Sequence, residues 1–221
     1  MKRKKYFTGI DLFAGAGGLS LGAQMAGIDV DLAIEQDPHA AATYALNHPG
    51  AKLIIDNIAN INDFPVSNKN RISFLFGGPP CQGFSTSNQR TRNKANVDNW
   101  LFREFIRIAK IYSPDWIVFE NVKGLIETEG GLFKDIIINH LKKIGYTCTS
   151  GALCAADFGV PQIRSRFFII GSKNKIKITL PVPTTHHRIT VKEAISDLPK
   201  VDNGANIDYL TYSNEPEMSR F

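Results

Sequence analysis

Short apolar runs alternate along the chain with segments of helical pattern, and this alternation limits the fold more than any other feature. A helix is expected after the glycine loop near residue 18, another at 38–47, begun by Asp37 as N-cap with Pro38 at its first position, and a third at 132–144. Strands joined through helices pack as a parallel sheet covered on both faces. The sequence therefore predicts an α/β protein with a doubly wound, mostly parallel sheet. The runs typical of buried strands are 6–13, 29–35, 51–56, 71–76, 115–120 and 166–172.

Charge and cysteine usage narrow the class of protein. The 221 residues include 26 Lys and Arg against 21 Asp and Glu, a net charge of +5 that mildly favours a polyanionic partner. The basic start leads into a strand rather than a signal-peptide core, and no apolar run is long enough to span a membrane, so a cytoplasmic protein is expected. Three scattered cysteines and the isolated pair His186 and His187 suit neither a disulfide framework nor a metal site. Cys148 and Cys154 are interpreted as structural.

The pattern changes near Ser172. Beyond it Lys, Pro, Thr and His predominate, with one short helical stretch at 190–198. We expect one domain at 1–172, followed at 173–221 by the start of a smaller, incomplete region with little capacity to fold alone.

The first loop, "DLFAGAGGLSLG" at 11–22, is a candidate ligand site. Glycines let the backbone turn tightly and approach a ligand, and the helix start behind them favours polar groups. The dinucleotide motif G-x-G-x-x-G would need glycine at position 20 after Gly15 and Gly17, where the chain has Ser20, so phosphate binding is disfavoured. Glu35, at the end of the second strand, is placed to accept hydrogen bonds from ribose hydroxyls. The pattern predicts a nucleoside-bearing cofactor; the alternative is a loop that only packs strand against helix.

The stretch "GGPPCQGFS" at 77–85 presents a cysteine at the end of a predicted strand. Pro79 and Pro80 restrict the backbone, so the thiol of Cys81 is held in one orientation. Glu120, at the end of the next predicted strand, could act as general acid towards whatever the thiol attacks, with Asn121 bracing the loop. The alternatives are a buried cysteine behaving as a small hydrophobe and a strand-end glutamate in water.

Two basic segments complete the candidate site. Arg164 and Arg166 are two residues apart just before an apolar run, so their side chains point to one face if the segment is extended. The pair could bind oxygen atoms of a ligand, and the equally supported alternative is a solvated pair of surface charges. The long polar segment 85–99 is of a length that is usually functional or disordered. Its side chains that suit phosphate contact are Arg90, Arg92 and Lys94.

Taken in order, these blocks resemble the cytosine-specific (carbon-5) DNA methyltransferases. The match runs from about Phe7 to Leu198, and the blocks that carry it are "DLFAGAGGLSLG", "EQD" with the later "DNI", "GGPPCQGFS", "ENV" and "QIRSR", with weaker "LFREFIRI" and "TVKEAISDLP". The resemblance implies the Rossmann-like fold of S-adenosylmethionine-dependent methyltransferases and double-stranded DNA as partner. It also implies a role in a restriction–modification system.

The resemblance also implies roles for individual residues. Cys81 is the nucleophile, Glu120 contacts the cytosine edge, and Arg164 and Arg166 hold Glu120 and the carbonyl oxygen of the base. The residues implied to bind S-adenosylmethionine are Phe13, Gly15, Gly17, Gly18, Leu19, Glu35, Gln36, Asp56, Ile58, Pro79 and Leu101. Those implied to contact DNA are Ser85, Ser87, Arg90, Arg92 and Lys94.

The implied reaction explains why a rigid thiol is needed. Addition of the Cys81 thiolate to carbon 6 of cytosine, with a proton from Glu120 to ring nitrogen 3, makes carbon 5 nucleophilic towards a methyl sulfonium. The base must leave the helix stack first, at a cost of a few kcal/mol.

The family continues beyond "AISDLP" into a target-recognition region and closing blocks that this sequence does not show. A split enzyme completed by a second polypeptide, a truncation and an inactive fragment are the three explanations, and the first is favoured. The competing functions are a catalytically silent module that binds cofactor or DNA, a tRNA cytosine methyltransferase and, more distantly, a nicotinamide oxidoreductase.

Overall fold

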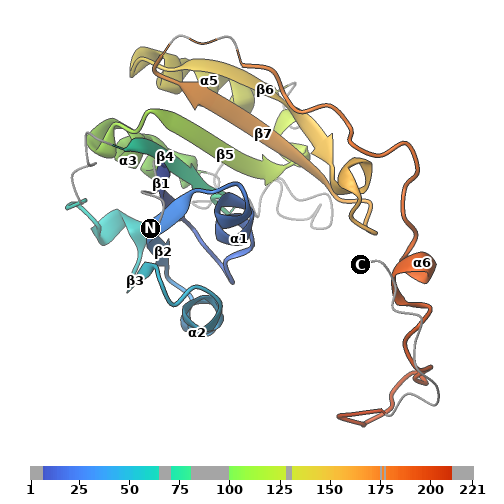
Figure 1. Ribbon diagram of the computed structural model, residues 1–221. Coiled ribbons are helices and arrows are strands. Elements are labelled where there is room, and N and C mark those ends of the chain that lie inside the picture. The colour runs from blue at the N-terminus through green and yellow to red at the C-terminus, as the bar shows by residue number, and fades with distance from the viewer. Residues whose placement is uncertain are drawn as a thin grey trace, which may run out of the picture. The chain divides into compact units, whose positions relative to one another are not determined.

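A single mixed sheet organises the protein (Figure 1). The computed structural model describes residues 7–64, 71–80, 100–127, 131–174, 176 and 178–210, and within them the sheet has seven strands in the order β3-β2-β1-β4-β5-β7-β6. Neighbours from β3 to β5 pair in parallel, whereas β7 runs antiparallel to β5. The expected α/β architecture with a mostly parallel sheet is confirmed. The strands are β1 Phe7–Leu12, β2 Asp29–Glu35, β3 Lys52–Ile55, β4 Ile72–Gly77, β5 Trp116–Val122, β6 Thr147–Cys154 and β7 Ser165–Ser172.

All of the helical segments in the described residues except α6 fall between these strands, as the alternating pattern predicts. Asp37 caps α2 as expected, because its Oδ1 accepts from the backbone N–H groups of His39 at 2.9 Å and Ala40 at 2.8 Å, with Pro38 in the first turn. The helical segments are α1 Gly18–Met25, α2 Pro38–Asn47, η1 Ile58–Asn60, α3 Phe102–Tyr112, α4 Gly124–Glu127, α5 Leu132–Lys143, η6 Ala155–Phe158 and α6 Val191–Ile195.

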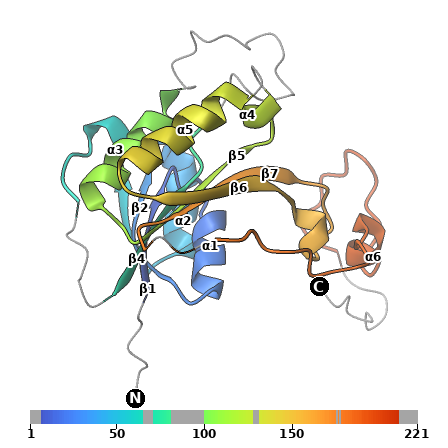
Figure 2. The ribbon, with the colours of Figure 1, turned by 90° about the horizontal axis from the view of Figure 1, so that it is seen from above.

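Buried side chains alternate between the two faces of the sheet. Ile10 and Leu12 of β1 belong to the main apolar cluster, which includes Phe105 of α3 and Phe133 of α5. Asp11, between them in sequence, points to the opposite face, where it accepts a hydrogen bond from Ser20 of α1, which also bonds Tyr44 of α2. Figures 1 and 2 show α3, α4 and α5 gathered together, apart from α1 and α2. Helices therefore cover both faces, which is the doubly wound arrangement.

Strand order reverses between β1 and β4. From β1 the chain steps outward to β2 and β3, and it then returns to place β4 and β5 on the other side of β1. In open α/β sheets a ligand crevice lies outside the carboxyl ends of the strands at such a reversal. The topology thus directs attention to the segments that follow β1, β2, β3 and β4.

The chain divides into two compact units. The larger contains residues 1–152 and 166–180, and the smaller contains 153–165 and 181–221. Within the smaller unit, Asp157 holds the later segment, since its carbonyl accepts from the N–H of Thr184 at 3.0 Å and its carboxylate pairs with Arg188 at 2.7 Å. The domain boundary expected after residue 172 stays a prediction. Among the described residues, no helix combines the length and apolar character needed to cross a membrane.

Candidate active site

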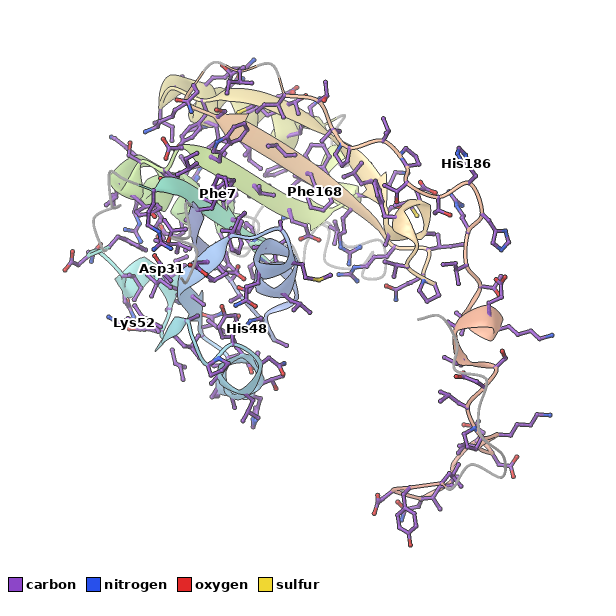
Figure 3. The ribbon with its side chains drawn as sticks, in the orientation of Figure 1. Phe7, Asp31, His48, Lys52, Phe168 and His186 are labelled. Atoms are coloured by element: carbon purple, nitrogen blue, oxygen red, sulfur yellow. The ribbon has the colours of Figure 1, made fainter. Side chains whose placement is uncertain are left out.

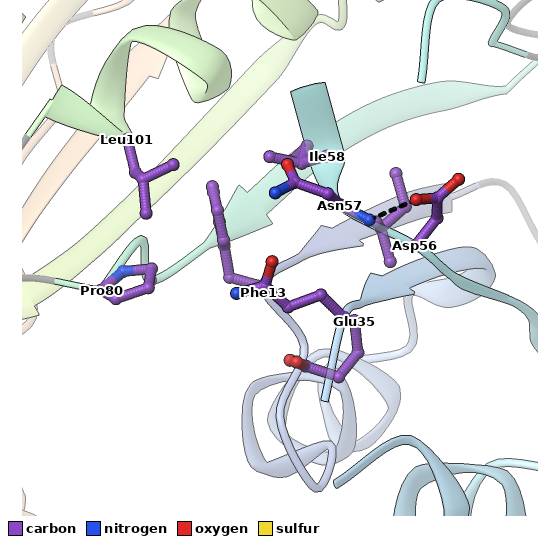
Figure 4. A pocket seen from close by; sticks show the side chains of 10 residues that line it. Phe13, Glu35, Asp56, Asn57, Ile58, Pro80 and Leu101 are labelled. Atoms are coloured by element: carbon purple, nitrogen blue, oxygen red, sulfur yellow. Dashed lines mark hydrogen bonds between the residues drawn. The ribbon is translucent and has the colours of Figure 1, made fainter. Parts of the chain in front are cut away.

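A pocket opens at the carboxyl ends of the parallel strands, at the reversal of strand order (Figure 4). Its empty space, including the open mouth, is about 560 Å³. Four strand-to-helix segments and the start of α3 contribute to it. The described residues that line it are Phe13, Ile34, Glu35, Gln36, Asp56, Asn57, Ile58, Gly78, Pro80 and Leu101.

Glu35 is held in place by the backbone of two loops. Its Oε2 accepts from the N–H of Gly15 at 2.7 Å, and its Oε1 accepts from the N–H of Asp37 at 2.8 Å. Gly15 has φ of 55°, a conformation that glycine adopts without strain. Each carboxylate oxygen keeps a further lone pair after these bonds, so Glu35 can still accept from a ligand hydroxyl.

Apolar side chains form the opposite walls. Phe13 has φ of 59°, which is costly for a side chain of its size and is seen chiefly where a site requires it. Ile58 and Leu101 face the same space (Figure 4). Glu35 and Asp56 supply negative charge, and none of the described lining residues is basic. The pocket suits a flat, partly apolar ligand with hydroxyls and a positive centre, and it disfavours a polyphosphate.

The segment Gly78–Pro80 joins this pocket to a second group of polar residues. Gly78 and Pro80 line the pocket, while a Cβ built at Gly78 would lie 2.6 Å from Oε2 of Glu120. Between them, the carbonyl of Pro79 accepts from Nδ2 of Asn121 at 3.1 Å, which is the bracing contact expected from the sequence. A side chain at position 78 would therefore collide with the carboxylate, and glycine allows the close approach.

Glu120 forms an ion pair with Arg166. Nε of Arg166 lies 3.0 Å from Oε1 of Glu120, and both side chains are about one quarter exposed. The antiparallel pairing of β5 and β7 places Val122 opposite Arg166 and Glu120 opposite Phe168, so the ion pair is a diagonal contact across the two strands. The guanidinium fixes the orientation of a carboxylate that also touches Gly78.

A buried polar network joins β1, α1 and α2 beside the glycine loop. Ser20 donates to Oδ2 of Asp11 at 2.6 Å, and its oxygen lies 2.8 Å from the hydroxyl of Tyr44, which must then be the donor. Burial raises the pKa of Asp11 to about 7 and raises that of Tyr44. Oδ1 of Asp11 has no hydrogen-bond partner within the described part of the chain.

His48 packs against this network and explains one of the glycines. Figure 3 labels His48. Its ring packs on Tyr44 at a centroid distance of 4.5 Å, and its Nδ1 lies 3.2 Å from Gln24 Oε1. A Cβ at Gly17 would lie 2.2 Å from Nε2 of His48, and Gly17 has φ of 94°. Packing within the protein thus accounts for Gly17.

The structure brings many of the predicted site residues together and leaves others apart. Five of the residues predicted to bind the cofactor do not line the pocket. Gly15 and Gly17 belong to the loop after β1, and Gly18 and Leu19 begin α1. Pro79 is buried beside the lining residue Pro80. Arg164 is exposed just before β7 and belongs to the smaller unit. Cys81 and the predicted DNA contacts Ser85, Ser87, Arg90, Arg92 and Lys94 lie outside the described residues. Those that share the pocket are Phe13, Glu35, Gln36, Asp56, Ile58 and Leu101.

Sequence reasoning did not identify Ile34, Asn57, Gly78 or Pro80 as lining residues. The sequence could have indicated the local role of Asn57, because Asn and Asp favour the N-cap of a short helical turn. Its Oδ1 accepts from the N–H of Ala59 at 2.9 Å at the start of η1.

Comparison with known proteins decides the family. The family model for the C-5 cytosine-specific DNA methylases matches residues 7–220. The chain belongs to this family. It is 39% identical over 203 residues to the type II methyltransferase M1.HphI of Haemophilus parahaemolyticus, covering 90% of this chain and 55% of that protein. It is 35% identical over 188 residues to the type II methyltransferase M.AquIA of Picosynechococcus, covering 79% of this chain and 75% of that protein.

A solved structure shows the same fold. A crystal structure described as a prophage-encoded DNA modification methyltransferase from E. coli superimposes with a TM-score of 0.71 at 32% identity, covering 88% of this chain and 56% of the other. The chain spans about half the length of the first curated relatives that it matches, at 55%, 52% and 47%. The family and fold expected from the sequence motifs are confirmed.

Proposed function

We propose that this chain is the cofactor-binding and catalytic part of a DNA (cytosine-5-)-methyltransferase that modifies DNA in the cytoplasm as part of a restriction–modification system. The observation that carries the proposal is the position of Gly78–Pro80, which lines the pocket on one side and touches Glu120 on the other. Cys81, to which we assign the role of nucleophile, follows Pro80 directly in the sequence.

The pocket fits S-adenosylmethionine. Glu35 supplies an oriented acceptor for ribose hydroxyls, and Ile58 and Leu101 supply apolar walls for a flat base. The carboxylates of Glu35 and Asp56 favour a ligand with a positive centre. When bound, the cofactor supplies an electrophilic methyl group. Ser20, in place of the third glycine of the dinucleotide motif, argues against a nicotinamide oxidoreductase.

The residues of the chain then have defined roles in the reaction. The Cys81 thiolate adds to carbon 6 of the flipped cytosine while Glu120 donates a proton to ring nitrogen 3, and the electron pair passes to carbon 5. Once carbon 5 has taken the methyl group and the sulfonium has become a thioether, a base would remove the carbon 5 proton, the bond to the Cys81 sulfur would break to release the thiolate, and ring nitrogen 3 would return its proton to Glu120. Arg166 keeps the Glu120 carboxyl aimed at the base. This arrangement needs accurate positioning, because an error near 1 Å can lower a rate roughly a hundredfold.

We further propose that a second polypeptide supplies target recognition. No residue from 181 to 210 is buried, although several large apolar side chains in this segment are exposed. We propose that this segment becomes covered by the second polypeptide. The most exposed are Val182, Val191, Val201 and Tyr209. The first relatives are about twice as long as the part that this chain matches, so each has further sequence outside the match.

Transfer of a labelled methyl group tests the proposed function. The chain is assayed with S-adenosylmethionine on DNA of mixed sequence and on tRNA, each with and without the polypeptide encoded downstream. We expect transfer to DNA cytosine, with sequence-specific activity only when the second polypeptide is present. Full sequence-specific activity of the isolated chain would exclude the split enzyme, and transfer to tRNA alone would favour the tRNA methyltransferase. Cofactor binding without any transfer would favour the catalytically silent module.

A further inference from the structure

Arg107 of α3 forms hydrogen bonds with the turn that carries one wall of the pocket. Its Nη2 donates to the carbonyl oxygens of Ile58 and Ile61, each at 2.9 Å, and its Nε donates to Oε2 of Glu104 at 2.7 Å. The Arg107 side chain is about 28% exposed. The guanidinium therefore joins a rigid helix to the short η1 turn through main-chain atoms.

The η1 turn holds the side chains that face the pocket. Asp56, Asn57 and Ile58 all line it, and they precede or begin the turn. Just before the turn, the N–H of Asp56 donates to the carbonyl of Glu35 at the end of β2 at 3.2 Å, and Ile58 of the turn packs in the main core. Three residues of 3₁₀ helix have poor internal hydrogen-bond geometry, so an external contact contributes much of their order.

The same helix also supplies the opposite wall. Leu101 is the N-cap of α3 and lines the pocket across from Ile58 (Figure 4). Arg107 lies about one and a half helical turns further on, and α3 is fixed in the main core by Phe105 and Ile108, neither of which is exposed. The spacing between the two apolar walls is thus set by one helix and one guanidinium.

We propose that Arg107 is a positioning residue for the cofactor pocket: it fixes the η1 turn so that Ile58 and Leu101 stand at the separation that a flat base requires. This inference rests on the proposed cofactor function. A lysine cannot replace the arginine fully, since an ammonium on a flexible stem lacks the planar fork that reaches the carbonyl oxygens and Glu104 together.

Hydrogen exchange of the free protein tests the contact directly. We compare Arg107→Ala and Arg107→Lys with Lys110→Ala, which removes an exposed charge from the same helix. The backbone amides of the peptide covering 56–62 should exchange about tenfold faster in Arg107→Ala than in the parent, and the increase should be smaller in Arg107→Lys. The reason is that the turn containing the amides of Asn60 and Ile61 loses the hydrogen bonds from the guanidinium. The α5 peptide 132–143 and the Lys110→Ala protein should exchange as the parent does.

Titration calorimetry with S-adenosylmethionine then tests the consequence for the pocket. We expect the Kd to rise about tenfold in Arg107→Ala and about threefold in Arg107→Lys, and to stay within twofold of the parent in Lys110→Ala. Unchanged exchange at 56–62, or a Kd for Arg107→Ala within twofold of the parent, would overturn the inference. Where Arg107→Ala fails to fold, Arg107→Lys decides by the same criteria. If the parent protein binds no S-adenosylmethionine, the proposed function is refuted instead. The exchange result would still decide whether Arg107 fixes the η1 turn.

Discussion

The buried carboxyl of Asp11 makes stability depend on pH in an unusual direction. Burial is the main cause that raises its pKa from 3.8 to about 7, with a smaller contribution from Glu35. The folded protein therefore holds a proton that the unfolded chain releases between about pH 4 and pH 7. Stability from this group falls as the pH rises through that window and is constant above it.

The size of the effect follows from the pKa difference. A shift of about 3 units corresponds to about 4 kcal/mol between the limits of low and high pH, of which about 2.5 kcal/mol falls between pH 5 and pH 8. Replacement of Asp11 by Asn removes the titrating group and keeps an oxygen that can accept from Ser20. Relative to the parent, Asp11→Asn should gain about 2.5 kcal/mol from pH 5 to pH 8, or about 5–10 °C in Tm for a chain of this length.

Urea unfolding followed by circular dichroism at both pH values measures this difference. The other ionisable groups are present in both proteins, so their contributions largely cancel in the comparison. Asp37→Asn is the matched control, because hydrogen bonds from the backbone N–H of Ala40 lower the pKa of this exposed carboxyl, so it does not titrate between pH 5 and pH 8. A stability difference between parent and Asp11→Asn that is equal at the two pH values would refute the reasoning, as would a difference of opposite sign.

Three other substitutions test the site from different directions. Gly17→Ala places a Cβ 2.2 Å from a buried imidazole in a left-handed backbone and should lower Tm by about 4–8 °C in a thermal melt, whereas Gly18→Ala, which meets open space, should change it by less than about 2 °C. Glu35→Gln loses one of two backbone acceptors and should weaken S-adenosylmethionine binding about tenfold by calorimetry; an unchanged Kd would exclude Glu35 from the cofactor site. Arg166→Ala leaves Glu120 without its guanidinium partner and should lower kcat about a hundredfold with cofactor affinity within twofold; an equal loss of both would show a structural role.

Local patterns were sufficient to predict most of the architecture. The apolar runs coincide with the strands of the sheet, and Asp37 with Pro38 marks the start of α2. The direction of a strand cannot be predicted in this way, because side chains alternate with a period of two residues in both parallel and antiparallel strands. The antiparallel course of β7, which brings Arg166 to Glu120, therefore could not be derived from the pattern of its own residues.

The site was predictable only where the residue type itself indicates the role. Glu35 was identified because it stands at a strand end beside a glycine loop. Pro79 was predicted to line the pocket, but Pro80 lines it, because the backbone direction decides which of two neighbouring prolines faces the ligand. Ser20 was noticed for the motif that it interrupts, and its actual partners Asp11 and Tyr44 come from separate elements. The partners of Arg107 are backbone carbonyl groups, which no sequence pattern displays.

The central claim is that the sulfur of Cys81 becomes covalently bonded to a cytosine held beside the cofactor pocket. DNA carrying 5-fluorocytosine traps this bond, since the fluorine at carbon 5 cannot leave as a proton does. With S-adenosylmethionine and the second polypeptide present, mass spectrometry of the digested complex should find the modified base on the peptide containing Cys81, and Cys81→Ala should form no adduct while still binding the cofactor. Methyl transfer by Cys81→Ala at even about a tenth of the parent rate, or an adduct on another residue, would contradict the account.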